Sequence, residues 1–423
     1  MTTYEDVDFY TSADEIIYEE AYFRIIRIST INVTIGIKKD GFAHRVYTAC
    51  NLGRLDNIHQ YGWLEKTPHT RMNHLFLTYA FTHYIMAGNQ IIGEESLVTL
   101  YFAALTHDVT TPAFGDRVKP IAPKDLDEEK TYARWIKRTN VQKFMQIYGI
   151  NPEECKKAVE GKNKIGRIID WADKIAYTYF DIAQIKERKP NIFNAFIQKV
   201  SLYRQSFKSP LIYELTPGTI LEKGYSLHTT LHNTHSDEIG SNDSQIFVCF
   251  VIIRAALLET ACFTSRTNAV YSFYGYIIIP HLIKHDILTI PSLLEKTDEE
   301  LARIIRAFFE TDELVVNPDY CSGQWWFNTE HEARNKVALE MEKPNTIAWY
   351  QTSIQYGDIC TSAVFKLNIY HNGIVEPIRD VGLCIPFIRK SEEYHRKRFH
   401  VISITDLPYK ETILIGVKDA IKK

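Results

Sequence analysis

Two histidines and two aspartates stand where the surrounding residues predict buried helix. His74 opens an amphipathic run, His107 and Asp108 close the apolar run 97–105, and Asp173 lies within a third helical run. A polar pair at the end of a buried helix costs free energy unless hydrogen bonds or a metal ion satisfy it. The helices must therefore pack so that these polar groups find partners, which restricts how the chain can fold.

The types and order of these four residues are typical of a metal site. Imidazole nitrogens and carboxylate oxygens bind borderline divalent ions such as Zn, Mn, Fe, Ni or Co, and also Mg where carboxylates dominate. A single His-Asp pair usually caps a helix or lies at the surface. Here the turn 112–115 ends the helix directly after the pair. We predict one divalent metal ion bound by His74, His107, Asp108 and Asp173.

Four segments around these residues resemble the motifs of a known family. They are Gly53–Gly62, His69–His74, Ala103–Gly115 and Asp173–Asp181. They resemble the HD-domain superfamily of metal-dependent phosphohydrolases, and most closely the deoxynucleoside triphosphate triphosphohydrolases. A fifth stretch, Ser292–Ala302, is similar to one that these proteins carry after their core. The resemblance implies helices that hold one metal ion and an enzyme that hydrolyses nucleotides.

The resemblance also implies how a nucleotide would be bound. Gln60 would read the sugar 3′-hydroxyl, and Tyr61 would lie at the sugar edge, where the family usually has Leu. Arg71 would contact the phosphates, and a cation beside a metal suits a polyanionic substrate. Arg or Lys next to a carboxylate is also an ordinary ion pair. The other positions that would line the triphosphate and the sugar are Lys174, Tyr177 and Asp181.

The chain departs from the family in its acid–base residues. The family has a catalytic His three positions after the HD pair, where this chain has Thr111, and the stretch 125–130 contains no His for the second one. Asp116 also replaces a His that commonly ends the HD segment. A hydroxyl cannot protonate a leaving oxygen as imidazolium does, whereas a carboxyl with a raised pKa can. The candidates for this role are Asp127, Glu128, Glu129, His69 and His59.

Composition and charge set the outer limits. The chain has 423 residues, 45% hydrophobic and 24% charged, enough for roughly two or three globular domains. The net charge of -3 gives no general attraction to nucleic acid or anionic membrane. The first residues are acidic and lack the apolar core of a signal peptide. The run 246–258 contains Arg254 and is shorter than the ~20 residues that span a bilayer, so it predicts a buried helix.

The cysteines indicate a reducing compartment. Seven cysteines are scattered without a CxxC pair, and an odd number argues against a disulfide framework. We therefore expect a cytoplasmic protein with no membrane partner.

Residue patterns divide the chain into three regions. Residues 1–50 are rich in β-branched residues and predict strands, and residues 51–310 follow the helical period. Residues 311–423 contain strand patterns and the hairpin signal Asn372-Gly373. We predict a mainly α fold, with an HD-domain helical core, a short N-terminal β-rich segment and a smaller C-terminal α+β region.

Three further segments bear on binding. The loop 115–127 lies beside the predicted site and is a candidate lid. The loop 224–244 contains His228, His232 and His235, which we interpret as a solvated loop rather than a second metal site. The basic residues between 389 and 398 are diluted by acids, so nucleic acid binding is possible but not indicated. The family resemblance implies a homo-oligomer.

The most specific function that these observations support is a (deoxy)nucleoside triphosphate triphosphohydrolase. The alternatives are an HD-type nucleotidase or phosphodiesterase, and a nucleotide-binding regulatory protein whose catalysis is impaired. Thr111 and the His-free stretch favour the regulatory alternative. Retention of Arg71, Lys174, Tyr177 and Asp181 favours nucleotide binding in all of these cases.

Overall fold

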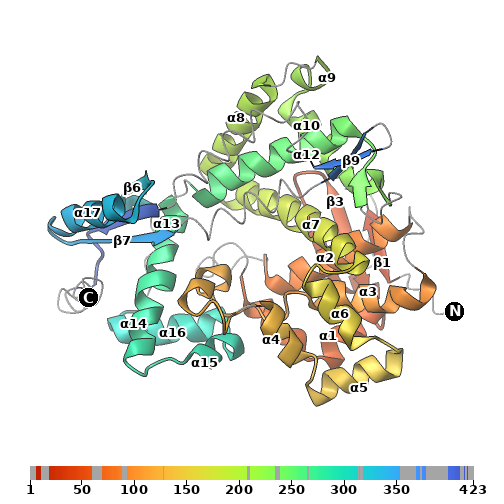
Figure 1. Ribbon diagram of the computed structural model, residues 1–423, viewed down its shortest axis with the longest axis horizontal. Coiled ribbons are helices and arrows are strands. Elements are labelled where there is room, and N and C mark those ends of the chain that lie inside the picture. Colours follow the sequence, from red (N-terminus) through yellow and green to blue (C-terminus); the bar gives the residue numbers. More distant parts are fainter. Residues whose placement is uncertain are drawn as a thin grey trace.

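The chain is built mainly of helices, as the sequence predicted (Figure 1). The computed structural model describes residues 6–10, 19–59, 69–87, 93–126, 128–206, 210–233, 239–263, 266–312, 314, 318–352, 368–371, 374–377, 399–409, 414 and 417.

Two long helices, α2 (Arg71–Ala87) and α7 (Lys164–Arg188), pack against each other at the centre of the molecule. Helix α3 (Glu94–Thr106) packs on both of them. Thirteen of the seventeen residues of α2 are buried, which explains why its sequence is apolar on several faces. Helix α7 begins at Asn163, whose side chain accepts the backbone N–H of Gly166 as an N-cap.

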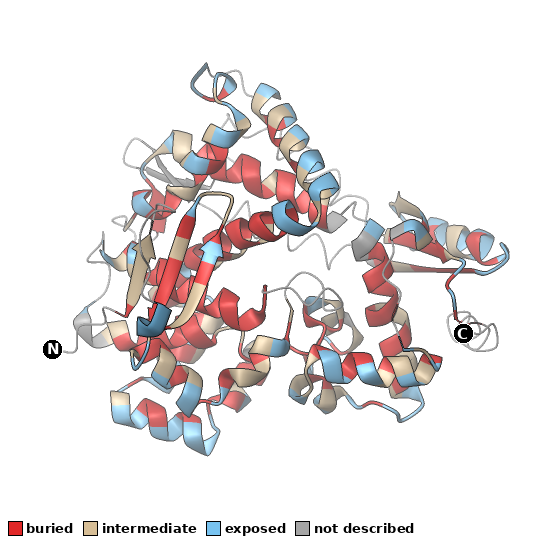
Figure 2. Cartoon of the chain, turned by 180° about the vertical axis from the view of Figure 1, so that it is seen from behind, coloured by how far each residue is buried: buried red, intermediate tan, exposed pale blue. Residues whose placement is uncertain are grey.

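The other helices surround this centre, with buried inner faces and exposed outer faces (Figure 2). The α-helices are α1 (Phe42–Ala49), α4 (Glu128–Trp135), α5 (Thr139–Tyr148), α6 (Pro152–Val159), α8 (Pro190–Ser206), α9 (Pro210–Tyr213), α10 (Pro217–Tyr225), α11 (Leu227–Thr230), α12 (Ser244–Leu257), α13 (Arg266–Phe273), α14 (Ile279–Lys284), α15 (Ile290–Glu295), α16 (Asp298–Phe309) and α17 (Glu330–Met341). Short 3-10 helices are η1 (Glu19–Ala21), η2 (Leu52–Asn57), η4 (Gly115–Arg117), η5 (Lys119–Ile121) and η8 (Pro318–Tyr320). Two π-helical turns are η6 (Leu258–Phe263) and η7 (Tyr274–Ile278).

The N-terminal strands form an antiparallel sheet that packs on the helices. Its strands are β1 (Val7–Tyr10), β2 (Tyr22–Ile28) and β3 (Val33–Lys38), in the order β1-β3-β2. In β3, the inward side chains of Val33, Ile35 and Ile37 are buried. Alternation of β-branched residues in this region therefore predicted the strands correctly.

The C-terminal region contains the predicted strands and one helix. Strands β6 (Cys321–Phe327), β10 (Phe399–Thr405) and β7 (Thr346–Thr352) form an antiparallel sheet in the order β6-β10-β7, and α17 packs against it. This sheet lies at one end of the molecule, next to α13 (Figure 1). Strands β8 (Asn368–His371) and β9 (Ile374–Pro377) pair antiparallel on either side of the predicted hairpin turn, whose two residues lie outside the described part.

The interpretation of 224–244 as a solvated loop is wrong where the structure describes it. Helix α11 and the paired strands β4 (Leu231–Asn233) and β5 (Ile239–Ser241) occupy much of it. His228 is buried, and its ring packs against the rings of Phe81 and Tyr84. The imidazole is therefore a core side chain, and its Nδ1 lies 2.5 Å from the carbonyl oxygen of Tyr225. His235 and the basic residues 389–398 lie outside the described residues.

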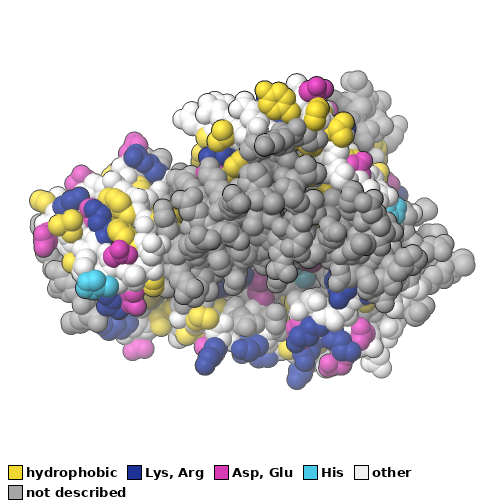
Figure 3. All heavy atoms as spheres, turned by 45° about the horizontal axis from the view of Figure 1, so that its top comes forward, with side chains coloured by type: hydrophobic (Ala, Val, Ile, Leu, Met, Phe, Trp, Pro, Cys, Tyr) yellow, Lys and Arg dark blue, Asp and Glu magenta, His cyan; other side chains and the backbone are white. Residues whose placement is uncertain are grey.

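The segment Ser244–Ala261 is long and apolar enough to cross a membrane, but 72% of it is buried inside the fold. The predicted buried helix is thus present as α12 and the start of η6. On the face drawn in Figure 3, the described basic and acidic side chains are interspersed.

Candidate metal centre

Three helices bring the four predicted ligand residues together. His74 lies in the first turns of α2, His107 caps the C-terminus of α3, and Asp108 follows in the turn. Asp173 projects from the middle of α7, which packs on both other helices. Close packing of these helices is what converts distant sequence positions into one cluster.

The ligand atoms are close enough to share one ion. Those of His74, His107 and Asp108 all lie within 4.8 Å of one another. The Asp173 Oδ1 atom lies 2.8 Å from His74 Nε2 and 3.6 Å from His107 Nε2. A mixed set of imidazoles and carboxylates is suited to a divalent transition metal or Mg.

Unsatisfied nitrogens at this cluster fit a bound metal ion. The Nε2 atoms of His74 and His107 are buried, and because their contacts with Asp173 lack hydrogen-bond geometry, neither has a hydrogen-bond partner among the described residues. His107 Nδ1 lies 3.0 Å from the carbonyl oxygen of Ala104, so it carries the proton and donates it there. This contact leaves the Nε2 lone pair of His107 directed at the cluster, as in metal-ligating histidines.

Opposite charges hold the cluster in its ionised form. Burial alone would lower the pKa of His107, but the carboxylates of Asp108 and Asp173 outweigh it and raise this pKa to about 9. Burial likewise favours the neutral form of Asp173, yet the two imidazoles hold its pKa well below its usual range. Without a metal ion, the carboxylates thus hold His107 as an imidazolium, and a bound ion would have to displace its Nε2 proton.

Arg71 contacts the cluster directly. Its guanidinium group donates to Asp108 Oδ2 at 2.7 Å and lies 3.3 Å from Asp116 Oδ2. Burial would lower the pKa of Arg71, but these carboxylates raise it, so the side chain stays charged. Arg71, which we predicted to contact phosphate, thus forms an ion pair with Asp108, one of the predicted metal ligands.

A series of ion pairs connects Asp116 to Glu128 through Lys119. The Lys119 ammonium lies 2.6 Å from Asp116 Oδ1 and 2.6 Å from Glu128 Oε1. The hydroxyl of Thr111 donates to Glu128 Oε1 at 3.3 Å. Burial raises the pKa of Glu128 despite the opposing effect of Lys119. Of the candidate acid–base carboxyls, Glu128 is the one whose side chain the structure describes, and it lies next to Thr111.

The buried His69 pairs with the partly buried Asp181 on the other side. His69 Nδ1 lies 3.1 Å from Asp181 Oδ1, and the imidazole ring packs edge-on against Phe180. Burial lowers the pKa of His69 well below its usual value and raises that of Asp181 to about 8. Both groups are therefore favoured in their neutral forms, in which the Asp181 carboxyl is a hydrogen-bond donor.

Two predicted binding residues follow Asp173 along α7. Lys174 is buried and forms an ion pair with Asp170, whose side chain is 56% exposed. Tyr177 lies one turn beyond Asp173, and its ring centroid is 6.4 Å from that of His74. Lys174 is thus engaged in an ordinary ion pair, whereas Tyr177 lies beside a metal-ligand histidine.

Sequence reasoning missed two cations near the site. The Arg254 guanidinium stacks on Tyr177, with 3.7 Å between Cζ and the ring centroid, and Arg254 is buried. The sequence did contain a signal for Arg254, because it is a charged residue inside the apolar run 246–258. Lys119 was missed although Asp116 lies only three residues before it, because its contact with Glu128 forms on folding.

A buried carboxylate, Asp298, fixes the turn after the HD pair. It accepts the backbone N–H groups of His59, at 2.7 Å, and Phe114, at 2.8 Å. Phe114 has a left-handed backbone with φ 65°, which costs free energy for a non-glycine residue. Arg54 adds a hydrogen bond to the carbonyl oxygen of Thr111 at 2.7 Å. His59 therefore serves the scaffold, since its ring also lies 3.2 Å from Asp298.

Several predicted site residues fall outside the described part of the chain. They are Gln60, Tyr61 and Asp127, together with the side chain of Glu129.

Solved structures share this fold over most of the chain. A hypothetical protein from Aquifex aeolicus matches with a TM-score of 0.57 and 14% identity, covering 95% of this chain and 100% of its own. A phosphohydrolase from Bacteroides thetaiotaomicron matches with a TM-score of 0.55 and 11% identity, covering 90% of this chain and 100% of its own. No family model matches the sequence, and no curated protein does so. At these identities the likeness shows the fold alone.

Proposed function

We propose that this protein is a metal-dependent phosphohydrolase that acts on nucleotides, with a (deoxy)nucleoside triphosphate as substrate. The observation that carries the proposal is the cluster of His74, His107 and Asp108, with Asp173 beside it and Arg71 bound to Asp108. It combines a metal-ligand set with a buried cation. The triphosphate preference and the metal's identity rest on the family resemblance and on the ligand chemistry.

Cations around the cluster support a polyanionic substrate. Arg71 is in contact with a metal ligand, and Arg254 stacks on Tyr177 beside His74. Guanidinium groups bind phosphate oxygens through paired hydrogen bonds, which orients the group as well as attracting it. A bound divalent ion would supply Lewis-acid charge to a phosphoryl oxygen and would acidify water. Arg71 would hold the phosphate chain against this charge.

Glu128 is our proposed general acid. Hydrolysis adds water to phosphorus and breaks the bond between phosphorus and the leaving oxygen, which takes up a proton. The raised pKa of Glu128 favours the protonated carboxyl from which that proton can come. Thr111 and Lys119 both contact Glu128 Oε1 and orient the group. Thr111 therefore positions the acid in this account, instead of replacing the missing His itself.

The second candidate is a nucleotide-binding regulatory protein without turnover. Thr111 at the His position favours it. A third possibility within the enzyme class is a nucleotidase or phosphodiesterase, because the cluster and its cations suit any phosphate ester.

Product analysis separates these functions. The protein is stripped of metal, reloaded in turn with Mn, Mg, Fe, Ni, Co and Zn, and incubated with ribo- and deoxynucleoside mono-, di- and triphosphates and cyclic nucleotides. We expect nucleoside and inorganic triphosphate from a triphosphate substrate, and no product from His107→Ala. Release of orthophosphate or opening of a cyclic ester would assign one of the other hydrolases. Binding without product would support the regulatory candidate, and absence of any nucleotide binding would refute the nucleotide assignment.

A further inference from the structure

Lys119 lies between two carboxylates beside the candidate metal centre. It is in η5, whereas Asp116 is in η4 and Glu128 begins α4, so three elements meet at its ammonium group. The Nζ atom lies 2.6 Å from Asp116 Oδ1 and 2.6 Å from Glu128 Oε1. The side chains of Lys119 and Glu128 are 28% and 25% exposed, so water screens this contact less than it would at the open surface.

The charges in this part of the site alternate in sign. Arg71 lies between the carboxylates of Asp108 and Asp116. Asp116 contacts Arg71 through Oδ2 and contacts Lys119 through Oδ1. The two cations therefore balance the carboxylates of Asp108 and Asp116, and the series is neutral when Glu128 carries a proton.

The surroundings of Glu128 act on its proton in opposite directions. Burial raises the pKa of Glu128, and Lys119 is the largest of the effects that lower it. The charged side chains that act on this carboxyl are Lys119, Asp108, Asp116 and Arg71. The two carboxylates raise the pKa further, and the arginine lowers it. Helix α6 also packs on α4, and its buried Cys155 acts there on Tyr132.

The described hydrogen-bond donors at the Glu128 side chain contact the same oxygen. Lys119 lies against Oε1, and the hydroxyl of Thr111 donates to Oε1 at 3.3 Å. In a neutral carboxyl, the carbonyl oxygen accepts hydrogen bonds and the other oxygen carries the proton. The proton of a neutral Glu128 is therefore favoured on Oε2.

We propose that Lys119 is a positioning residue for proton release by Glu128: it holds Oε1 so that the proton leaves from Oε2, and it stabilises the carboxylate that remains. This role rests on the proposed function, in which Glu128 is the acid. The O–H bond at Oε2 breaks, and the leaving oxygen gains the proton as its bond to phosphorus breaks. The electron pair of the O–H bond stays on Glu128, where the ammonium group offsets the new negative charge.

Four variants of the full-length chain separate this role from a structural one. Lys119→Met keeps an unbranched side chain but removes the charge and the hydrogen bond. Its matched control is Lys124→Met in the same loop, where the side chain is exposed. Lys119→Arg restores a cation. Asp116→Asn acts in the opposite direction, because it removes the anion that shares Lys119 with Glu128.

The dependence of turnover on pH reports the acid. With the nucleotide and metal that give the highest rate, kcat falls as pH rises through the pKa of Glu128, because a general acid must be protonated. Loss of the cation raises that pKa, so we expect the alkaline limb of Lys119→Met to move to higher pH by about one unit or more. At neutral pH its kcat should fall about tenfold or more with little change in KM, since the carboxylate left behind is less stable.

The other variants have distinct expected results. Lys119→Arg and Lys124→Met should keep the alkaline limb of wild type. In Asp116→Asn the limb should move to lower pH, because Lys119 then acts on Glu128 without a competing carboxylate. This opposite shift keeps the test valid if Lys119→Met does not fold.

Infrared spectroscopy measures the same proton without turnover. The difference spectrum between each protein and its Glu128→Gln counterpart isolates the C=O band of the protonated Glu128 carboxyl, which disappears as the group ionises. We expect this band to persist to higher pH in Lys119→Met than in wild type, and to disappear at lower pH in Asp116→Asn.

The results that would overturn the role are equally specific. A limb and an infrared band at the wild-type pH in both Lys119→Met and Asp116→Asn would refute it. A raised KM with an unshifted limb in Lys119→Met would show that Lys119 binds substrate instead. The infrared shifts in a protein that hydrolyses no nucleotide would refute the proposed function and leave the effect of Lys119 on Glu128 standing.

Discussion

At the scale of single residues, the chemistry depends on a few buried groups whose neighbours change their pKa. Glu128 and Asp181 are both carboxyls for which burial favours the protonated form. Their surroundings differ, because Glu128 contacts Lys119 whereas Asp181 lies against the neutral His69. We assign the proton transfer to Glu128 and a substrate-facing role to Asp181, which lies two turns beyond Asp173 on α7.

Glu128→Gln should lower kcat by about 10²- to 10⁴-fold with little change in KM, because the amide keeps an acceptor oxygen but cannot release a proton. The measurement is steady-state turnover with the metal that supports the highest rate. Glu129→Gln and Asp127→Asn are the matched controls. Loss of turnover in either control, with Glu128→Gln fully active, would reassign the acid.

Asp181 should make metal-free protein less stable as pH rises. Its pKa of about 8 in the folded chain lies above the ordinary value of 3.8, so the folded state holds a proton that the unfolded state loses. The resulting destabilisation is absent below about pH 4, grows by up to about 1.4 kcal/mol per pH unit, and levels off above pH 8. Asp181→Asn lacks this effect.

Urea unfolding of wild type and Asp181→Asn between pH 5 and pH 8 measures the difference directly. We expect the variant to gain stability relative to wild type as pH rises, since all other titrations are common to both proteins. A difference that does not vary with pH would show that Asp181 ionises normally.

At the scale of elements, the turn after the HD pair is fixed by a helix far along the chain. The carboxylate of Asp298, at the start of α16, binds the backbone of Phe114 and of His59. The Ala113 N–H adds a hydrogen bond to the carbonyl oxygen of Leu293 at 2.8 Å. The stretch 292–302 therefore helps to fix the turn that follows His107 and Asp108.

Asp298→Ala should lower the free energy of unfolding by a few kcal/mol, because each buried N–H left without a partner costs about 1–3 kcal/mol. Glu299→Ala, in the same turn of α16 but 47% exposed, should change it by less than about 0.5 kcal/mol. Chemical denaturation of both variants provides the comparison. Equal stability of the two would show that Asp298 does not hold the turn.

The elements that sequence predicted best are those with strong periodicity. Helices α2, α3 and α7 and strands β2, β3, β7 and β10 follow the apolar patterns of their segments. The same patterns placed the four predicted ligand residues at or next to helix ends or on helix faces. The residues 224–244 were misread because their polar composition resembles a loop, whereas His228 is buried by side chains distant in sequence.

The sequence predicted which residues meet at the site only where those residues belong to a recognisable motif. The four ligand residues and Arg71 stand in recognisable segments. Lys119 and Arg254 have no motif, and their roles depend on which charges and rings folding brings within reach. Sequence also offered three carboxyls as the acid, and among their side chains the structure describes that of Glu128, in contact with Thr111.

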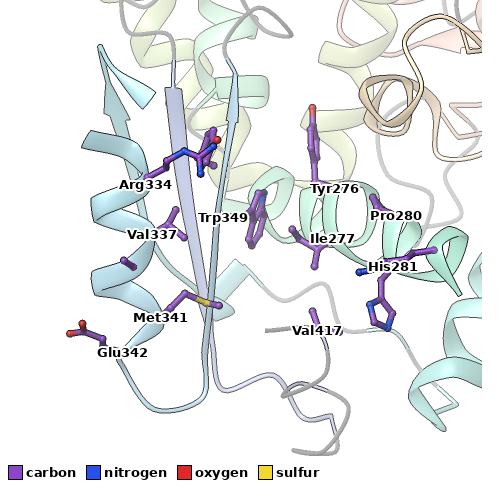
Figure 4. A pocket seen from close by; sticks show the side chains of 13 residues that line it. Tyr276, Ile277, Pro280, His281, Arg334, Val337, Met341, Glu342, Trp349 and Val417 are labelled. Carbon is purple, nitrogen blue, oxygen red and sulfur yellow. The ribbon is translucent and has the colours of Figure 1, made fainter. Parts of the chain in front are cut away.

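At the scale of the whole molecule, the helical core and the C-terminal region are joined through η7. This π-helical turn packs on Arg117 near the metal centre, and Tyr276 within it lines a cavity beside the C-terminal sheet (Figure 4). π-Turns within α-helices are frequent at functional sites. One short element, η7, therefore contacts both the loop beside the metal centre and the C-terminal region.

The central claim is a divalent metal ion at His74, His107, Asp108 and Asp173, and elemental analysis tests it most directly. Wild type should carry about one ion per chain. His107→Ala and Asp173→Asn should carry little, since each variant loses one of the four residues proposed to bind the same ion. Asp170→Asn should keep the ion, because Asp170 pairs with Lys174. His228→Ala, which also removes a buried imidazole, separates loss of metal from loss of stability. Equal metal content in wild type and His107→Ala would contradict the account.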